Sequence, residues 1–351
     1  MNAPLLTLLA ATFLAAGPAL KLADSAPPAQ YKVTITVKGD KRIIESNGIP
    51  DHQVAAFPNR GNPNAISEQK YRLEVPAHPQ PATAQPGRFP YAWGVALNGV
   101  VFDPGTAEVY NDGDRSNPWH YEALKSNTEM GTTPRIPVGL GIDQNHGHVQ
   151  PNGAYHYHGL PTLLIARLSG GEPKMTHVGW AADGYPVYAI HAYAKSEDPK
   201  SALKPMKSSY RLKTADRGGD GKETPTGKPD GSFGLDYEYV PGHGDLDEFG
   251  GRTGVTPEFP QGTYYYVLTE EFPFIPRKLR APRILRSTRC AWTPTPTSAD
   301  RAARAPRAKG KARRARLPSN RVRRTVNAKV GAWLHRALSA EEGHDVVLPL
   351  P

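Results

Sequence analysis

Short stretches of alternating apolar and polar residues recur along this chain and predict β-strands. Such alternation places apolar side chains on one face of a strand and polar side chains on the other. Stretches long enough for extended helices are few, and glycine and proline separate the strands. The chain is therefore expected to be mainly β, an antiparallel sandwich-like or barrel-like domain with long loops and little helix. The predicted strands are residues 31–38, 71–75, 91–97, 100–102, 177–180, 185–190 and 262–269.

Two turn signals join neighbouring predicted strands into hairpins. Asn98-Gly99 lies between residues 91–97 and 100–102, and Asn-Gly is a strong two-residue hairpin signal. Asp183-Gly184 occupies the corresponding place before residues 185–190. The composition agrees, because 34 glycines, 36 prolines and 16 tyrosines in 351 residues favour many short strands joined by turns.

The chain divides by composition into four parts. Residues 1–26 are an apolar run followed by small residues, typical of a signal peptide and too short for an ordinary membrane helix. We therefore expect a secreted or periplasmic protein. Residues 27–89 predict a strand-containing segment and a proline-rich linker, residues 90–277 a β-rich domain, and residues 278–351 a basic tail rich in Arg, Ala and Pro.

The net charge of +10 comes from the tail. From Arg277 to the end there are 19 Lys and Arg residues against 4 Asp and Glu, so the remaining body is mildly acidic. No specific nucleic-acid partner is therefore expected for the body, and its true partners are unknown from sequence. The tail has two interpretations: a disordered cationic arm that binds polyanions non-specifically, or the product of a shifted reading frame.

The densest candidate chemistry lies between His146 and His158. Two His-x-His pairs, His146/His148 and His156/His158, flank Pro151-Asn152-Gly153. Residues two apart on a strand share a face, so each pair offers two imidazoles on one side. A three-residue loop would place His148 opposite His156 and all four imidazoles on one face, whereas a two-residue loop would separate the pairs.

Imidazole clusters of this kind favour a metal site. Neutral imidazole suits zinc and copper, which are the divalent metals expected here. The single cysteine, Cys290, lies in the tail, so ligands in the body must be nitrogen or oxygen. In this interpretation Tyr155 and Tyr157 occupy the opposite, packed face. The alternative is a metal-free strand whose histidines bind carbonyls or carboxylates.

Several carboxylates and histidines elsewhere are candidate partners of the site. Asp245, Asp247 and Glu248 are the catalytic candidates, acting as general base or completing a metal shell, or else they bind loop N–H groups. A histidine that binds a metal through one ring nitrogen usually donates a hydrogen bond from the other to a carboxylate or a carbonyl, which orients the ring. We call such a group an outer partner. The candidates for that outer role are Asp143, His177, Asp183 and His243. Nucleophile-elbow, Walker, dinucleotide-binding and His-Glu-x-x-His signatures are missing from the sequence.

The segment Asn-Gly-Ala-Tyr-His-Tyr-His-Gly-Leu-Pro at residues 152–161 resembles the signature of the YHYH-domain family of predicted secreted proteins. Similar flanking pieces extend the resemblance over roughly residues 90–277. The resemblance implies that His148, His156 and His158 belong to the shared motif, whereas His146 occupies a more variable position. The flanking pieces begin at Trp93, Trp119, Asp183, Asp245 and Gly254.

These observations lead to three functional hypotheses. The first is an exported protein that binds a divalent metal at the histidine hairpin. The second is a metal-dependent hydrolase that uses three histidines and a carboxylate. The third is a metal-free β module whose tyrosine- and tryptophan-rich faces bind a glycan or a protein.

Overall fold

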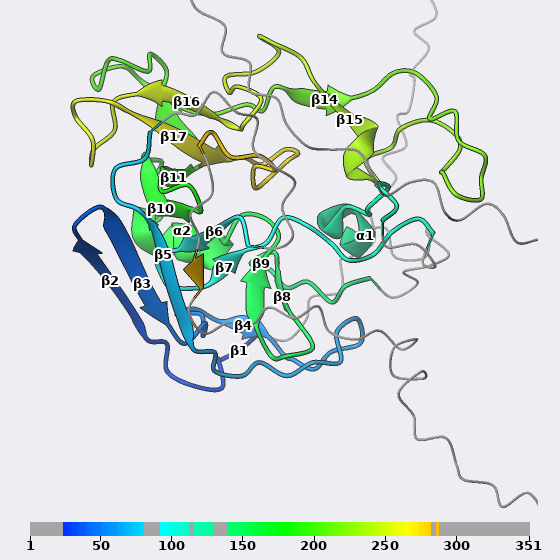
Figure 1. Cartoon of the computed structure of the whole chain (residues 1–351), viewed down its shortest axis with the longest axis horizontal. Helices are drawn as coiled ribbons and strands as arrows, with labels where there is room; N and C mark the ends of the chain where they lie inside the picture. Colours follow the sequence, from blue (N-terminus) through cyan, green and yellow to red (C-terminus); the bar gives the residue numbers. More distant parts are fainter. Residues whose placement is uncertain (1–23, 81–91, 112–115, 129–138, 282–285, 288–351) are drawn as a thin grey trace, which may run out of the picture. The chain divides into compact units, whose positions relative to one another are not determined.

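The computed structural model describes residues 24–80, 92–111, 116–128, 139–281 and 286–287 (Figure 1). Most of the predicted signal peptide and of the basic tail lie outside these residues. The largest element is an eight-stranded sheet. In spatial order its strands are β16 (Gly251–Gly254), β17 (Thr263–Leu268), β11 (Pro186–Ala189), β10 (Thr176–Ala181), β6 (Gly94–Ala96), β7 (Val101–Phe102), β9 (Tyr155–Tyr157) and β8 (Gly147–Val149).

A four-stranded sheet and three strand pairs complete the β structure of the described residues. The four-stranded sheet has the order β18 (Arg286–Ser287), β5 (Tyr71–Pro76), β3 (Lys41–Ser46) and β2 (Val33–Lys38). The pairs are β1 (Asp24–Ser25) with β4 (Val54–Ala55), β12 (His191–Tyr193) with β13 (Leu203–Pro205), and β14 (Tyr210–Leu212) with β15 (Tyr237–Tyr239). The helices are α1 (Ala123–Thr128), α2 (Thr162–Ser169) and the 3-10 helix η1 (Gly234–Asp236).

Both predicted hairpins are present. Around Asn98-Gly99, β6 and β7 pair antiparallel with Val95 opposite Val101. Around Asp183-Gly184, β10 and β11 pair antiparallel, and Gly184 has a φ of 93°. Helix α2 (Thr162–Ser169) follows β9 closely in the chain. Within the described residues, none of the helices combines the length and the apolar character that a membrane crossing requires.

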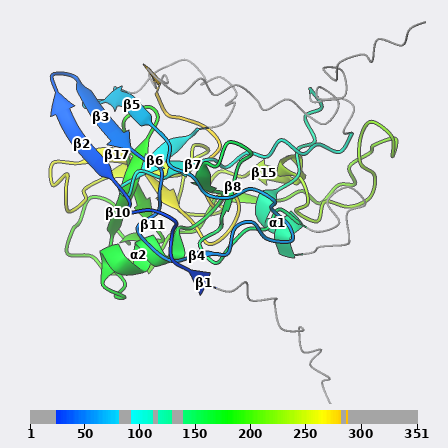
Figure 2. The ribbon, with the colours of Figure 1, turned by 90° about the horizontal axis from the view of Figure 1, so that it is seen from below.

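The two faces of the eight-stranded sheet contact different layers. On one face, Val95 and Val101 pack against Ile44, Tyr71 and Leu73 of the four-stranded sheet. The other face packs into a larger core that includes Leu164 of α2, and Figure 2 shows the four-stranded sheet and α2 on opposite sides of β6 and β10. This layered arrangement agrees with the sandwich-like expectation.

The eight-stranded sheet is mixed and open, which corrects two details of the expectation. Strands β7 and β9 run parallel, as do β11 and β17, so the sheet is not purely antiparallel. The long connection from β7 to β9 allows the chain to return and enter the sheet in the same direction. The barrel-like alternative is wrong, because β16 and β8 are the two edges of the sheet in the described part of the chain.

Residues 278–281 belong to the packed body, although their composition assigned them to the tail. Leu279 and Ala281 are buried in the large core. The indole Nε1 of Trp93 donates a hydrogen bond to the carbonyl of Lys278 at 3.1 Å. The start of the basic tail therefore lies beyond Ala281 in structural terms.

Candidate metal centre

Between β8 and β9, the hairpin turn closed by Gln150 and Ala154 has three residues, Pro151 to Gly153. The Gln150 N–H donates to the Ala154 carbonyl at 2.9 Å, and His148 lies opposite His156. Gly153 has a φ of 83°, the left-handed conformation that ends such a loop. A Cβ at this glycine would lie 2.0 Å from the Ser67 hydroxyl oxygen, so the position also has no room for a larger residue. Of the two loop lengths that the sequence left open, the structure has the longer one.

This register brings three imidazoles together on one face. The Nε2 atom of His158 lies 3.0 Å from Nε2 of His156 and 3.0 Å from Nε2 of His148. The three ring centroids are each 4.7 Å from the other two, so the rings surround one point symmetrically. An ion at the usual zinc–nitrogen distance of about 2.0–2.1 Å fits between nitrogens with this separation.

Backbone carbonyls fix the tautomers of two of the rings. Nδ1 of His148 faces the Leu140 carbonyl at 2.8 Å, and Nδ1 of His156 faces the Ala154 carbonyl at 3.2 Å. A carbonyl accepts only, so each Nδ1 carries the proton of its neutral ring and each Nε2 presents a lone pair. A proton on Nε2 of His158 would satisfy only one of these two lone pairs. A cation at the centre satisfies all three nitrogens.

The site keeps its imidazoles neutral. His156 and His158 are only 2 % and 3 % exposed. Burial lowers the pKa of His148, and it lowers the pKa of His156 and His158 further, with a smaller contribution from the neighbouring rings. The positive charge of Arg277 also lowers the pKa of His158. Neutral imidazole is the form that binds metals.

His146 does not join the three other histidines. Its φ is 53°, and its Nδ1 faces the Leu160 carbonyl at 2.8 Å. The only group of metal-ligand side chains found among the described residues is His148, His156 and His158, with ligand atoms within 4.8 Å of one another. The left-handed backbone at His146 breaks the strand alternation that would have placed its ring on the same face.

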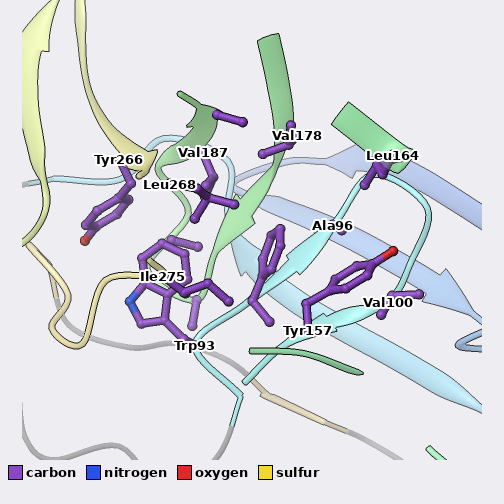
Figure 3. Packing of buried hydrophobic residues seen from close by; sticks show 14 of the residues in the cluster. Trp93, Ala96, Val100, Tyr157, Leu164, Val178, Val187, Tyr266, Leu268 and Ile275 are labelled. Atoms are coloured by element: carbon purple, nitrogen blue, oxygen red, sulfur yellow. The ribbon is translucent and has the colours of Figure 1, made fainter. Parts of the chain in front are cut away.

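The opposite face of the hairpin is held by two buried tyrosines. Tyr155 and Tyr157 are both fully buried in the large core, as predicted, and Figure 3 shows Tyr157 beside Val100. The Tyr155 hydroxyl donates to Asp143 at 2.8 Å. The Tyr157 hydroxyl lies 2.6 Å from Nε2 of His52 and accepts a bond from the Asn98 amide at 2.8 Å. These bonds fix the strand that carries His156 and His158.

Residues 72–281 match the model of the family described as YHYH protein. The chain belongs to the YHYH protein family. The match starts earlier than the resemblance seen in the sequence and includes β5 of the four-stranded sheet except for its first residue. Neither a curated protein nor a solved structure showed significant similarity to the chain.

Asp143 and Asp183, predicted as outer partners of the histidines, bind other groups instead. Asp143 organises the entry to β8 by accepting hydrogen bonds from the N–H groups of Asn145 and Gly147, at 2.9 and 3.1 Å. Asp183 instead accepts bonds from the Tyr266 hydroxyl and the Arg280 N–H, and burial raises its pKa to about 6. The expected outer role is filled by the carbonyls of Leu140 and Ala154.

The two remaining outer candidates are likewise placed by the structure. His177 lies on β10, and its Nε2 faces the Gly179 carbonyl at 2.9 Å. His243 lies in the exposed loop after β15, where its N–H donates to the Val240 carbonyl at 3.1 Å. Neither residue belongs to the group of three imidazoles among the described side chains.

The three predicted catalytic carboxylates of the YHYH chain have other partners. Asp245 pairs with Lys204 at 2.6 Å, and Glu248 pairs with Lys278 at 2.6 Å. Asp247 accepts hydrogen bonds from the Phe249 and Gly251 N–H groups and from the Tyr264 hydroxyl. None of the three joins the imidazole group in the part of the chain that the structure describes.

Asp103 and Arg277 are charged residues linked to β9 that no sequence motif singled out. Asp103 directly follows β7, the strand that pairs with β9, and its backbone N–H donates to the Tyr157 carbonyl at 2.9 Å. The positive charge of Arg277 lowers the pKa of both His158 and Asp103, although burial holds the pKa of Asp103 well above its usual value. Arg277 also pairs with buried Glu122 at 2.7 Å. The one available signal was the position of Asp103 at the end of a confidently predicted strand.

Proposed function

We propose that this YHYH protein binds one divalent transition metal, zinc or copper, through His148, His156 and His158. The observation that carries the proposal is the fixed tautomer of His148 and His156, whose Nε2 lone pairs face a common point. Nitrogen ligands favour zinc and copper over magnesium and calcium, which prefer oxygen. The carbonyl behind each of these rings is the outer partner that metal-binding histidines usually have.

Metal analysis tests this proposal. We expect about one zinc or copper ion per chain in tag-free wild-type protein after dialysis against the metal, and almost none in the His156→Ala/His158→Ala variant. His191→Ala is the control, because His191 lies on β12, outside the group of three imidazoles. Equal metal content in wild type and the double variant would remove the site and would favour the metal-free binding module.

Hydrolysis is the second candidate function. Three imidazoles and no carboxylate make up the group among the described residues, so a bound ion would keep at least one coordination position for water. Zinc sites with three protein ligands and an open position are the catalytic type, whereas closed four-ligand sites are structural.

We also propose that the protein acts outside the cytoplasm. The apolar composition of residues 1–26 supports this. Sequencing the N-terminus of protein recovered from its native host is the test. A chain that starts near residue 26 in an extracytoplasmic fraction would agree with export, and an intact Met1 in the cytoplasm would contradict it.

A further inference from the structure

The carboxylate of Asp103 is buried with weak hydrogen bonds. The residue is 2 % exposed. Its two acceptor contacts among the described residues, the Gly105 N–H and the Gln150 amide, are both at 3.4 Å. This is beyond the usual range of about 2.7–3.2 Å for such bonds. A buried carboxylate is costly without strong partners, so Asp103 is able to accept a further, shorter hydrogen bond from a bound molecule.

The parallel pairing places Asp103 beside His158. Val101 lies opposite His156 and Phe102 lies opposite Tyr157, where the printed pairing of the two strands ends. The Asp103 N–H donates to the Tyr157 carbonyl at 2.9 Å, so the backbone of Asp103 follows β7 directly and lies next to the start of the His158 residue. Neighbouring strands are about 4.8 Å apart. Val101 and Phe102 contact opposite layers, and alternation returns Asp103 to the face of Val101, which is the face of His156.

Gln150 gives an independent indication of the same position. It follows His148 by two residues, so its side chain belongs to the imidazole face of the hairpin. Its amide reaches the Asp103 carboxylate at 3.4 Å. Asp103 is therefore connected to the site from β7 and from the end of β8.

Asp103 follows the strand next to β9 and is not itself a ligand. Two atoms bound to one ion at about 2.1 Å cannot be more than about 4.2 Å apart. No carboxylate of the described residues belongs to the imidazole group, whose ligand atoms lie within 4.8 Å of one another. Asp103 can therefore reach an ion only through a bridging molecule, and water is the smallest such molecule.

We propose that Asp103 is the proton acceptor for a water molecule on the metal and that the protein hydrolyses esters. This inference rests on the metal site proposed above. Asp103 takes one proton from the water, and the hydroxide adds to the carbonyl carbon or the phosphorus of the ester. The bond to the leaving oxygen then breaks, and the proton passes from Asp103 to that oxygen.

Arg277 supplies the positive charge for such a reaction. Its charge acts on both His158 and Asp103. Its Nε is buried and has no hydrogen-bond partner among the described residues. The charge of Arg277 can stabilise an ester oxygen that gains negative charge during the reaction, without a direct contact with the buried Nε. Carboxylic and phosphate esters share this requirement.

Zinc-loaded wild-type protein and its Asp103→Asn variant test the proposal with two probes. The probes are p-nitrophenyl acetate and p-nitrophenyl phosphate, which distinguish the two classes of ester. Asn keeps the shape of Asp103 and removes its charge. We expect Asp103→Asn to bind as much zinc as wild type and to hydrolyse the preferred probe about 100-fold more slowly, within the usual contribution of a general base.

Two further variants keep the test decisive. Gln150→Ala removes the amide that contacts Asp103, and we expect a smaller loss of rate with unchanged zinc content. This variant remains informative if Asp103→Asn fails to fold. Asp198→Asn is the control, because Asp198 lies in the exposed turn between β12 and β13, where it binds the Lys200 N–H at 2.9 Å.

The outcomes separate this proposal from the metal site itself. Zinc-loaded wild type that hydrolyses neither probe faster than free zinc overturns the proposal and leaves the metal site standing. An Asp103→Asn variant that hydrolyses the probe at the wild-type rate also overturns the proposal. The same holds if the variant is slower only because it binds less zinc, so that its rate per bound zinc equals that of wild type. Wild type that binds no zinc or copper overturns the metal site and this proposal together.

Discussion

His148 and His156 lie directly opposite each other on β8 and β9, with 4.7 Å between their ring centroids. Their alignment depends on the three-residue loop that ends at Gly153.

Replacement of Gly153 by alanine should destabilise the protein. The left-handed backbone costs a Cβ-bearing residue about 1–2 kcal/mol, and the contact with Ser67 adds to this. Gly170→Ala is the matched control, because Gly170 has a φ of 70° but nothing within 4 Å of a new Cβ. Chemical denaturation should show a larger loss for Gly153→Ala. Equal losses would mean that Ser67 moves away without cost.

Metal removal should lower the thermal stability of the wild-type protein. A ligand that binds only the folded state at 100 times its Kd stabilises that state by about 2.7 kcal/mol. For a body of this size we expect the melting temperature to fall by about 5 °C or more when a chelator is added. The His156→Ala/His158→Ala variant should melt at the same temperature with and without chelator, as differential scanning fluorimetry would reveal.

Acid should destabilise the metal-free protein through the three imidazoles. Their pKa values are lowered by burial in the folded state, whereas the unfolded chain titrates near 6.5. As the pH falls below about 6.5, the unfolded state gains protons that the folded state does not bind. Each such histidine then costs about 1.4 kcal/mol of stability per pH unit.

Urea denaturation between pH 7.5 and 5.5 measures this effect. The free energy of unfolding should fall less steeply in His156→Gln/His158→Gln than in wild type, because two of the proton-linked groups are gone. Parallel pH profiles for the two proteins would show that the imidazoles are not the source of the acid sensitivity.

Loss of the Tyr157 hydroxyl should also lower the free energy of unfolding. In Tyr157→Phe, His52 and Asn98 keep buried polar groups that have lost a partner. Leaving such groups unsatisfied costs about 1–3 kcal/mol. Tyr31→Phe should have almost no effect, since Tyr31 is 44 % exposed. A stability of Tyr157→Phe within error of wild type would show that the network contributes little.

Local sequence signals were enough to predict several of the strands and the candidate ligands His148, His156 and His158. Asn98-Gly99 and Asp183-Gly184 gave their hairpins, because turn chemistry acts over a few residues. The spacing of His156 and His158 predicted, for the same reason, that both point to the same side of the hairpin. The loop length stayed open, since both turns are compatible with the residues Pro151 to Gly153.

Contacts between distant segments could not be predicted in the same way. Asp103 reaches the site through the parallel pairing of β7 with β9, which no short pattern encodes. His146 has the same spacing from His148 as His156 has from His158, yet its left-handed backbone points its ring elsewhere. Asp245 and Glu248 looked available in sequence, but Lys204 and Lys278 from separate segments neutralise them.

The two tyrosines of β9 point into the hydrophobic core. His156 points to the other face, toward the proposed metal position. A single residue inserted or deleted between Gln150 and Ala154 would leave β9 in place and turn the imidazole of His148 toward the wrong side, or else rotate β9 and force phenol rings out of the core. The number of residues in this one bend therefore couples folding to chemistry, so a change of length there would be more damaging than most changes of sequence.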